Sequence, residues 1–225
     1  MDSLPRMAAS EAEQRSTGLR ERKARKARAR ASAAARRLIL EKGYDQTSLE
    51  DIAEEAETSV STLLRYFGSK ERLALAARVE ALERFRQIVT APGPTPTLER
   101  WRSFVAELAQ REPTADWEAD HRLIATVPQI HRLNSHLQRC YQDLLAEGFA
   151  REAGVDPDHD LYGRLLAALL VAGNEAVFHR WLATGKQRSL VETCLEVIDF
   201  AEARLGRRED VPGQGHASAG PAASG

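Results

Sequence analysis

The chain has 225 residues and a formal net charge of −1, and 43% of its residues are hydrophobic. This length allows one or two domains with a sizeable core, and the abundance of Ala, Leu, Glu and Arg with only 6% aromatic residues favours an all-α fold. Two cysteines are too few for a disulfide framework, and we find neither a signal-peptide core nor a run of 18 uncharged apolar residues, so we expect a cytoplasmic protein without a membrane segment.

Basic residues are concentrated near the start of the chain. Between residues 15 and 37, ten Lys and Arg side chains stand against one acidic residue, Glu21. The local electrostatic potential, rather than the total charge, attracts phosphate groups, so this segment indicates contact with nucleic acid. The alternative is that the charged residues only face solvent. We expect a disordered basic arm at residues 1–21 and a DNA-binding domain at residues 22–68, with Arg25 among its DNA contacts.

Downstream of the basic segment, the sequence predicts two short helices joined by a tight turn and followed by the start of a third. Thr47 or Ser48 can cap the first helix, in which small and apolar residues recur at helical spacing. Thr58 and Ser59 can cap the second helix, residues 60–67. A capped helix of this length, with small hydrogen-bonding side chains near its start, is typical of the helix that a helix-turn-helix inserts into the DNA major groove.

The DNA contacts expected from this arrangement lie on the second helix and around the caps. Ser61, Thr62 and Arg65 project from early and outer positions of that helix and are expected to contact base edges. The full set of expected contacts is Arg25, Thr47, Ser48, Ser59, Val60, Ser61, Thr62, Leu64, Arg65, Tyr66 and Lys70.

This segment resembles the signature of the TetR family of bacterial transcriptional repressors. The matching positions are Thr47, Ile52, Ala53, Ala56, Ser59, Thr62, Leu63, Tyr66, Phe67, Lys70, Glu71 and Leu73. The resemblance implies a homodimer that binds a palindromic operator and is released by a small-molecule effector. It also implies that Thr47, Tyr66 and Lys70 hold phosphates.

Three features depart from the family pattern. Glu57 and Thr58 replace the usual Gly-Val of the turn, Ser61 replaces a glycine, and Leu64 replaces a tyrosine that commonly contacts the DNA backbone. Leu64 is expected to pack inward or to meet a thymine methyl group. Glu57 in a left-handed turn conformation costs on the order of 1 kcal/mol relative to glycine.

The remaining sequence keeps helical periodicity to about residue 205. An unbroken helix is predicted from residue 69 to 89, and it links the DNA-binding domain to a regulatory and dimerisation domain at residues 69–206. Asp156 with Pro157 predicts a helix start, and Ser189 with Glu192 predicts a capping box. Further helices are predicted at residues 98–111, 115–126, 128–153, 157–182 and 189–205, and a disordered tail at residues 207–225.

The last two predicted helices are apolar on more than one face. Residues 161–182 contain the run LLAALLVAGNEAVF, and an apolar stripe on the final helix comprises Val191, Leu195, Ile198 and Phe200. A peripheral helix of a monomer would show a polar half, and the family resemblance implies a four-helix dimer interface at this place. Burial within one chain is the alternative.

An effector pocket is expected, by resemblance, among the helices of residues 98–182. Aromatic residues at helical spacing are more often plain core than ligand contacts, so both interpretations stay open for each. Asn174, Glu175 and His179 interrupt an apolar helix and would either orient a ligand or hydrogen-bond across a dimer seam. The candidate effector-binding residues are Trp101, Phe104, Trp117, His121, Tyr141, Asn174 and Phe178.

We find no motif for catalysis, a metal or a cofactor. The acidic cluster at residues 156–160 is better explained by helix capping than by metal binding, and the GSK at residues 68–70 lacks the upstream glycine of a phosphate loop. A ligand-responsive repressor is the favoured interpretation. An architectural DNA-binding protein and a small helical enzyme are the alternatives.

Overall fold

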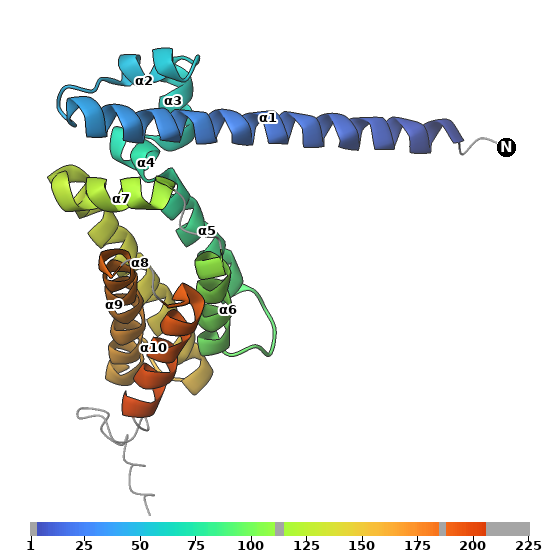
Figure 1. The fold of residues 1–225 in the computed structure, drawn as a ribbon. Helices are drawn as coiled ribbons and strands as arrows, with labels where there is room; N and C mark the ends of the chain where they lie inside the picture. The colour runs from blue at the N-terminus through green and yellow to red at the C-terminus, as the bar shows by residue number, and fades with distance from the viewer. Residues whose placement is uncertain (1–3, 111–114, 185–187, 206–225) are drawn as a thin grey trace, which may run out of the picture. The chain divides into compact units, whose positions relative to one another are not determined.

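A computed structural model describes residues 4–110, 115–184 and 188–205, and every regular element in this part of the chain is a helix (Figure 1). The predicted all-α fold is therefore confirmed. The predicted tail falls on residues that the structure does not describe. The helices are α1 Leu4–Lys42, α2 Leu49–Glu55, α3 Val60–Phe67, α4 Lys70–Ala74, α5 Ala76–Thr90, α6 Thr97–Gln110, α7 Ala115–Thr126, α8 Pro128–Ala153, α9 Leu161–Ala183 and α10 Leu190–Leu205.

The helices form two compact units that are interleaved along the sequence. The first unit comprises the chain up to Val79 together with Ala115–Leu133, and the second unit begins at Glu80 and resumes at Asn134. Our predicted division at residue 69 groups residues 115–126 with the later helices, whereas in the structure α7 packs against α1 within the first unit.

The first unit is built on a close crossing of α1, α2 and α3. Its core buries several alanines, which let helix axes approach closely, together with larger aliphatic side chains such as Ile52 and Leu63. Ser48 caps α2 in a capping box with Asp51, and Ser59 caps α3 by accepting a hydrogen bond from the backbone N–H of Thr62. The predicted bounds of α3 are confirmed.

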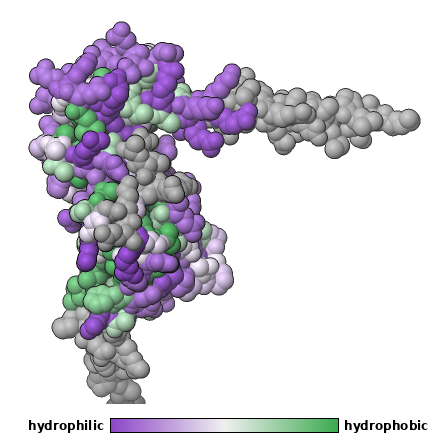
Figure 2. Space-filling view, in the orientation of Figure 1, coloured by the Kyte–Doolittle hydropathy of each residue, from purple (hydrophilic) through white to green (hydrophobic). Residues whose placement is uncertain are grey.

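α1 begins at Leu4, so residues 4–21, expected to be a disordered arm, have a helical backbone. Ala, Arg, Glu and Lys are strong helix formers, which accounts for the continuation of α1 in this direction. Between residues 22 and 30, most side chains of α1 are exposed and hydrophilic (Figure 2).

The prediction of one unbroken helix from residue 69 to 89 is wrong. The chain bends at Leu75, which caps α4 with φ −101° and ψ 28°, and α5 starts at the next residue. Leu75 is fully buried in a cluster with Ile39, Leu123 and Ile130. The segment contains neither Gly nor Pro, so the bend follows from tertiary burial of Leu75 rather than from a local sequence signal.

The predicted start of a helix at Pro157 is also wrong, because α9 begins at Leu161. Asp160 is the cap, and its Oδ1 accepts a hydrogen bond from the backbone N–H of Gly163 at 3.1 Å. A Cβ on Gly163 would lie 2.4 Å from a carboxylate oxygen of Asp160, so only glycine fits beside this cap. The Asp156 carboxylate instead accepts from the N–H of Asp158 in the preceding turn.

The second unit packs α10 against both α9 and α6. By length and composition α9 could cross a membrane, whereas we expected no such segment. A single helix of this kind is weak evidence, since core and interface helices meet the same test, and α9 buries Leu166, Leu170 and Phe178 inside its own unit.

Candidate nucleic-acid interface and regulatory core

Three hydroxyl groups gather at the start of α3. The Ser59 Oγ accepts a hydrogen bond from the Thr62 N–H at 3.2 Å, and it lies 3.0 Å from the Ser61 Oγ and 2.8 Å from the Thr62 Oγ1. Ser59 and Ser61 are exposed. The positive end of the helix dipole attracts phosphate oxygens. The hydroxyl groups can donate or accept hydrogen bonds, so they can contact either phosphate oxygens or base edges.

The turn between α2 and α3 contains a residue in the left-handed conformation, as the departure from the family pattern implied. Glu57 has φ +50°, and the following N–H, that of Thr58, donates to the Ala53 carbonyl oxygen at 2.8 Å. The Glu57 carboxylate also forms an ion pair with Arg30 of α1 at 2.8 Å. The turn therefore keeps its shape without glycine and is tied to α1.

The outer face of α3 presents two large side chains to solvent. Leu64 and Tyr66 are each 43% exposed. Inward packing of Leu64 is therefore ruled out, and contact with a thymine methyl group is the surviving alternative. The guanidinium carbons of Arg28 and Arg65 lie 4.9 Å and 5.0 Å from the centroid of the Tyr66 ring.

Thr47 and Lys70, both expected on phosphates, are engaged inside the first unit. Thr47 is 1% exposed, and its hydroxyl donates to the Gly43 carbonyl oxygen at 2.8 Å. The Lys70 ammonium donates to the carbonyl oxygens of Tyr44 and Thr47 at 2.7 Å and 2.8 Å. Their phosphate roles stay predictions, and this geometry favours bracing of the connection between α1 and α2.

Tyr44 and Glu71 extend the same brace. The Tyr44 hydroxyl donates to the Glu71 carboxylate, and Lys70 lies 3.9 Å from the centroid of the Tyr44 ring. Burial, followed by the hydrogen bond to Glu71, raises the pKa of Tyr44. Burial opposes ionisation of Glu71, but hydrogen bonds from Tyr44 and Ser69 outweigh it and lower the pKa of that carboxyl group.

A buried charge cluster, which sequence reasoning missed, joins α1, α5 and α7 in the first unit. Asp120 is 3% exposed, and its carboxylate oxygens lie 3.6 Å from the Arg36 Nε and 4.0 Å from the Arg78 Nε. The Arg36 guanidinium donates to the Ser32 hydroxyl, and an Arg78 Nη lies 3.0 Å from the His121 Nε2. Helical spacing alone does not reveal partners so far apart in sequence.

The structure divides the candidate effector residues between the two units. Trp117 and His121 lie on α7 of the first unit. The other candidates belong to the second unit, on α6, α8 and α9. The effector pocket predicted from the sequence stays a prediction, and its candidate residues belong to both units.

Four rings pack on one another in the second unit. Phe85, Trp101, Phe104 and Tyr141 have centroids 4.9–6.0 Å apart in every pair. Phe85, Trp101 and Phe104 are at most 5% exposed. Three of these rings, Trp101, Phe104 and Tyr141, are candidate effector residues, and in this structure they pack on one another and on Phe85.

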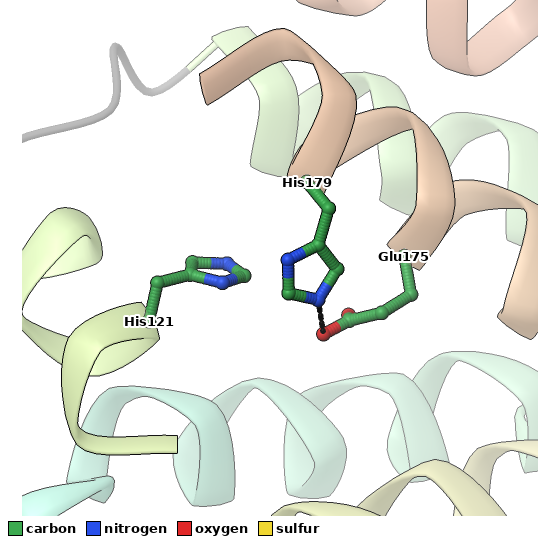
Figure 3. Close-up of side chains that lie close together, drawn as sticks. All are labelled: His121, Glu175 and His179. Carbon is green, nitrogen blue, oxygen red and sulfur yellow. Dashed lines mark ion pairs between the residues drawn. The ribbon is translucent and has the colours of Figure 1, made fainter. Parts of the chain in front are cut away.

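Asn174 of α9 contacts one ring of this cluster, that of Trp101. With its amide oriented to satisfy both neighbours, it accepts a hydrogen bond from the Trp101 indole N–H at 3.2 Å and donates to the Cys194 carbonyl oxygen at 3.1 Å. The next residue of α9, Glu175, has its carboxylate 3.4 Å from the ring of His179, one turn further along the helix (Figure 3). Phe178, the remaining candidate, is buried and stacks on Trp181 at 6.2 Å.

A row of leucines on α9 faces solvent. Leu161, Leu165 and Leu169 recur every four residues and are 40%, 39% and 45% exposed, and Phe200 on α10 is 60% exposed. Exposed apolar side chains in such a row mark an interaction surface more often than isolated ones do. Leu170 is fully buried, so the row and the core occupy different faces of α9.

Comparison with known proteins connects both units to regulators. Residues 32–77 match the family described as bacterial regulatory proteins, tetR family, and residues 95–206 match the MftR C-terminal domain. The HTH-type transcriptional regulator TcmR of Streptomyces glaucescens is 31% identical over 183 residues, which cover 73% of this chain and 76% of TcmR.

Solved structures of regulators share the fold. The fatty acid degradation regulator FadR from Bacillus halodurans aligns with a TM-score of 0.53 and 22% identity, over 80% of this chain and 95% of its own. SmeT, the repressor of a Stenotrophomonas maltophilia multidrug efflux pump, aligns with a TM-score of 0.53 and 18% identity, over 79% of this chain and 89% of its own.

Proposed function

The chain belongs to the TetR family of bacterial regulatory proteins, and on this premise we propose that it is a cytoplasmic repressor that binds a palindromic operator as a homodimer and is released by a small, largely apolar effector. The DNA-binding part of the proposal is supported by the structure of α3. It is capped by Ser59, and it presents hydroxyls at its start and an exposed Leu64 on its outer face.

In this proposal α3 reads the major groove. Ser61 and Thr62 form hydrogen bonds to base edges, and Leu64 contacts a thymine methyl group. The exposed cations of α1, Arg25 among them, add affinity that depends on salt and little on sequence. Because the operator lies in the cytoplasm of a bacterial cell, the regulator acts there.

The proposed dimer forms through α9 and α10. Two reading helices must lie about 34–36 Å apart, or a multiple of this distance, to meet successive major grooves on one side of DNA, and a two-fold interface between copies supplies such a spacing. The exposed leucine row of α9 and the neighbouring Phe200 supply apolar side chains that a second copy would bury.

The proposed effector site lies in the second unit. Trp101, Phe104 and Tyr141 offer a large apolar surface, and Asn174 is a polar group hydrogen-bonded to Trp101. Ligand pockets combine these two features, so an effector would displace ring contacts and compete for the Asn174 amide.

The experiment that tests the proposal is selection of DNA from a random duplex library with the full-length protein, followed by sedimentation of the protein with and without the recovered site. We expect an inverted repeat and a dimer at micromolar concentration. Recovery of random sequence would indicate an architectural DNA-binding protein, and a monomer on a single half-site would overturn the dimeric arrangement.

A further inference from the structure

Three exposed side chains from two helices meet at one aromatic ring in the first unit. Tyr66 of α3 carries the ring, and the guanidinium groups of Arg28 from α1 and Arg65 from α3 both lie over it, at 4.9 Å and 5.0 Å from the centroid. Arg28 and Tyr66 are far apart in sequence, so the packing of α1 on the helix-turn-helix brings them together.

The cations of α1 differ in whether a carboxylate already neutralises them. Arg30 pairs with Glu57 at 2.8 Å, and Arg37 pairs with Glu41 at 2.5 Å and with Glu55 at 2.8 Å. Over the described ranges of the chain, no carboxylate lies within ion-pair distance of Arg28 or Arg65. Two uncompensated positive charges therefore lie beside a single exposed ring.

A guanidinium group held over a ring face keeps its N–H groups available. Contact with the ring restricts the long side chain, and a guanidinium group that is not paired with a carboxylate can donate its N–H groups to the oxygen atoms of a phosphate. Each guanidinium group lies about 5 Å from the same ring centroid, so the two positive charges attract an anion near this ring more strongly than either charge does alone. The arrangement therefore favours an anion with several oxygen atoms.

We propose that Arg28, Tyr66 and Arg65 form a clamp for one phosphate of the DNA backbone beside the groove that α3 reads. This inference rests on the proposed function of α3. In the clamp Tyr66 acts through its ring rather than its hydroxyl, and Arg65 holds the backbone instead of a base edge, contrary to our expectation from the sequence. Arg28, outside the helix-turn-helix, becomes a residue that fixes the register of α3 on DNA.

The test compares binding of the selected operator and of a random duplex of equal length over a range of salt concentrations. Arg28→Ala and Arg65→Ala should each weaken binding about tenfold on both duplexes, the loss expected for one charge-assisted contact. Each should also reduce the salt slope by slightly less than one unit. Tyr66→Leu should weaken binding similarly, whereas Tyr66→Phe, which keeps the ring, should retain most of the affinity.

Arg30→Ala is the matched control, because it also removes one positive charge from α1. In this case Glu57 already neutralises the charge that is removed. We expect it to weaken binding less than Arg28→Ala does. Combining Arg28→Ala with Tyr66→Leu should cost little more than either change alone, because both remove the same contact. Thermal unfolding of every variant establishes that it folds.

Several outcomes would overturn the clamp. These are equal losses for Arg28→Ala and Arg30→Ala, equal losses for Tyr66→Phe and Tyr66→Leu, or a loss for Arg65→Ala on the operator alone, which would restore a base contact. If the wild-type protein recovers no preferred site from the library, the proposed function fails. If it recovers one and Arg28→Ala binds it normally, only the clamp fails.

Discussion

The two units bury different kinds of side chain. The core around α1, α2 and α3 is rich in small residues, among them Ala31, Ala34, Ala35, Ala53 and Ala56. The second unit buries large rings, among them Phe85, Trp101, Phe104, Phe149 and Phe178. Small residues bring helix backbones close together, whereas interlocking rings determine where the helices lie by filling the space between them.

This difference fits the task proposed for each unit. A helix that reads DNA must keep one position relative to its neighbours, and a close crossing of small residues leaves few alternative packings. An apolar ligand can replace contacts between rings with contacts of its own, so a core of rings can accept one by repacking. The Asn174 side chain, hydrogen-bonded to Trp101 and to the Cys194 carbonyl oxygen, supplies the polar group that such a site needs.

The difference between the two cores is tested most strongly by truncating one core side chain in each unit and comparing the losses in stability. Phe104→Ala should lower the free energy of unfolding by about 3–5 kcal/mol, because the ring is 1% exposed and contacts three other rings. Ala53→Gly in α2 should cost only about 1 kcal/mol, mostly through backbone entropy. Urea unfolding followed by circular dichroism measures both. A smaller loss for Phe104→Ala than for Ala53→Gly would contradict the assigned role of the rings.

The exposed and buried faces of α9 give the next largest effect. Leu165→Glu places a charge in the exposed row and should dissociate the proposed dimer, which weakens operator binding by on the order of 100-fold through loss of the second half-site. Leu170→Glu makes the same change on the buried face and should unfold the second unit. Sedimentation and circular dichroism separate the two results. If the Leu165→Glu variant stays dimeric, the dimer interface does not include the exposed row of α9.

The sequence predicted the local features of the fold well, because their causes are local. Caps, prolines and apolar spacing placed α3, α7 and α8 at their observed bounds, and the glycine that the family pattern has in the turn identified Glu57 as the residue that would take a left-handed conformation. The Ser189 cap of α10 was also predicted, and its Oγ accepts from the Glu192 N–H at 3.3 Å. Each of these features depends on residues within a few positions of one another.

Features that depend on distant partners were missed. The bend at Leu75 follows from burial against α1 and α7, and the Arg36–Asp120–Arg78 cluster joins three helices. The packing of α7, which carries Trp117 and His121, against α1 also joins segments that lie far apart in the sequence. The Arg28–Tyr66 contact likewise requires the crossing angle of two helices, which spacing does not provide.

Acid should reveal the brace that holds α4 to the end of α1 in the first unit. The pKa of Glu71 is lowered in the folded state, so its contribution to stability is complete above the unfolded value, about 4.3, and is lost as the pH falls through the lower folded value. Wild-type protein should therefore lose stability more steeply in this acid range than Glu71→Gln. Melting temperatures of both proteins measured from pH 7 to pH 3 test this. If the two melting temperatures fall equally with pH, Glu71 does not contribute to acid sensitivity.

The smallest expected effect concerns the turn before the reading helix. Glu57→Gly relieves the left-handed strain, worth about 1 kcal/mol, but also removes an exposed ion pair with Arg30 that contributes about 0–1 kcal/mol. The net gain in stability should therefore be a few tenths of a kcal/mol.

Glu57→Asn separates the two contributions, because asparagine tolerates this conformation and carries no charge. Both variants remove a negative charge near the proposed phosphate contacts and free Arg30, so operator affinity should rise slightly in each, most clearly at low salt. Thermal unfolding and binding at two salt concentrations measure these changes. If both variants lose stability, the Arg30 ion pair outweighs the strain, and the turn is held to α1 more firmly than the exposure of the pair indicates.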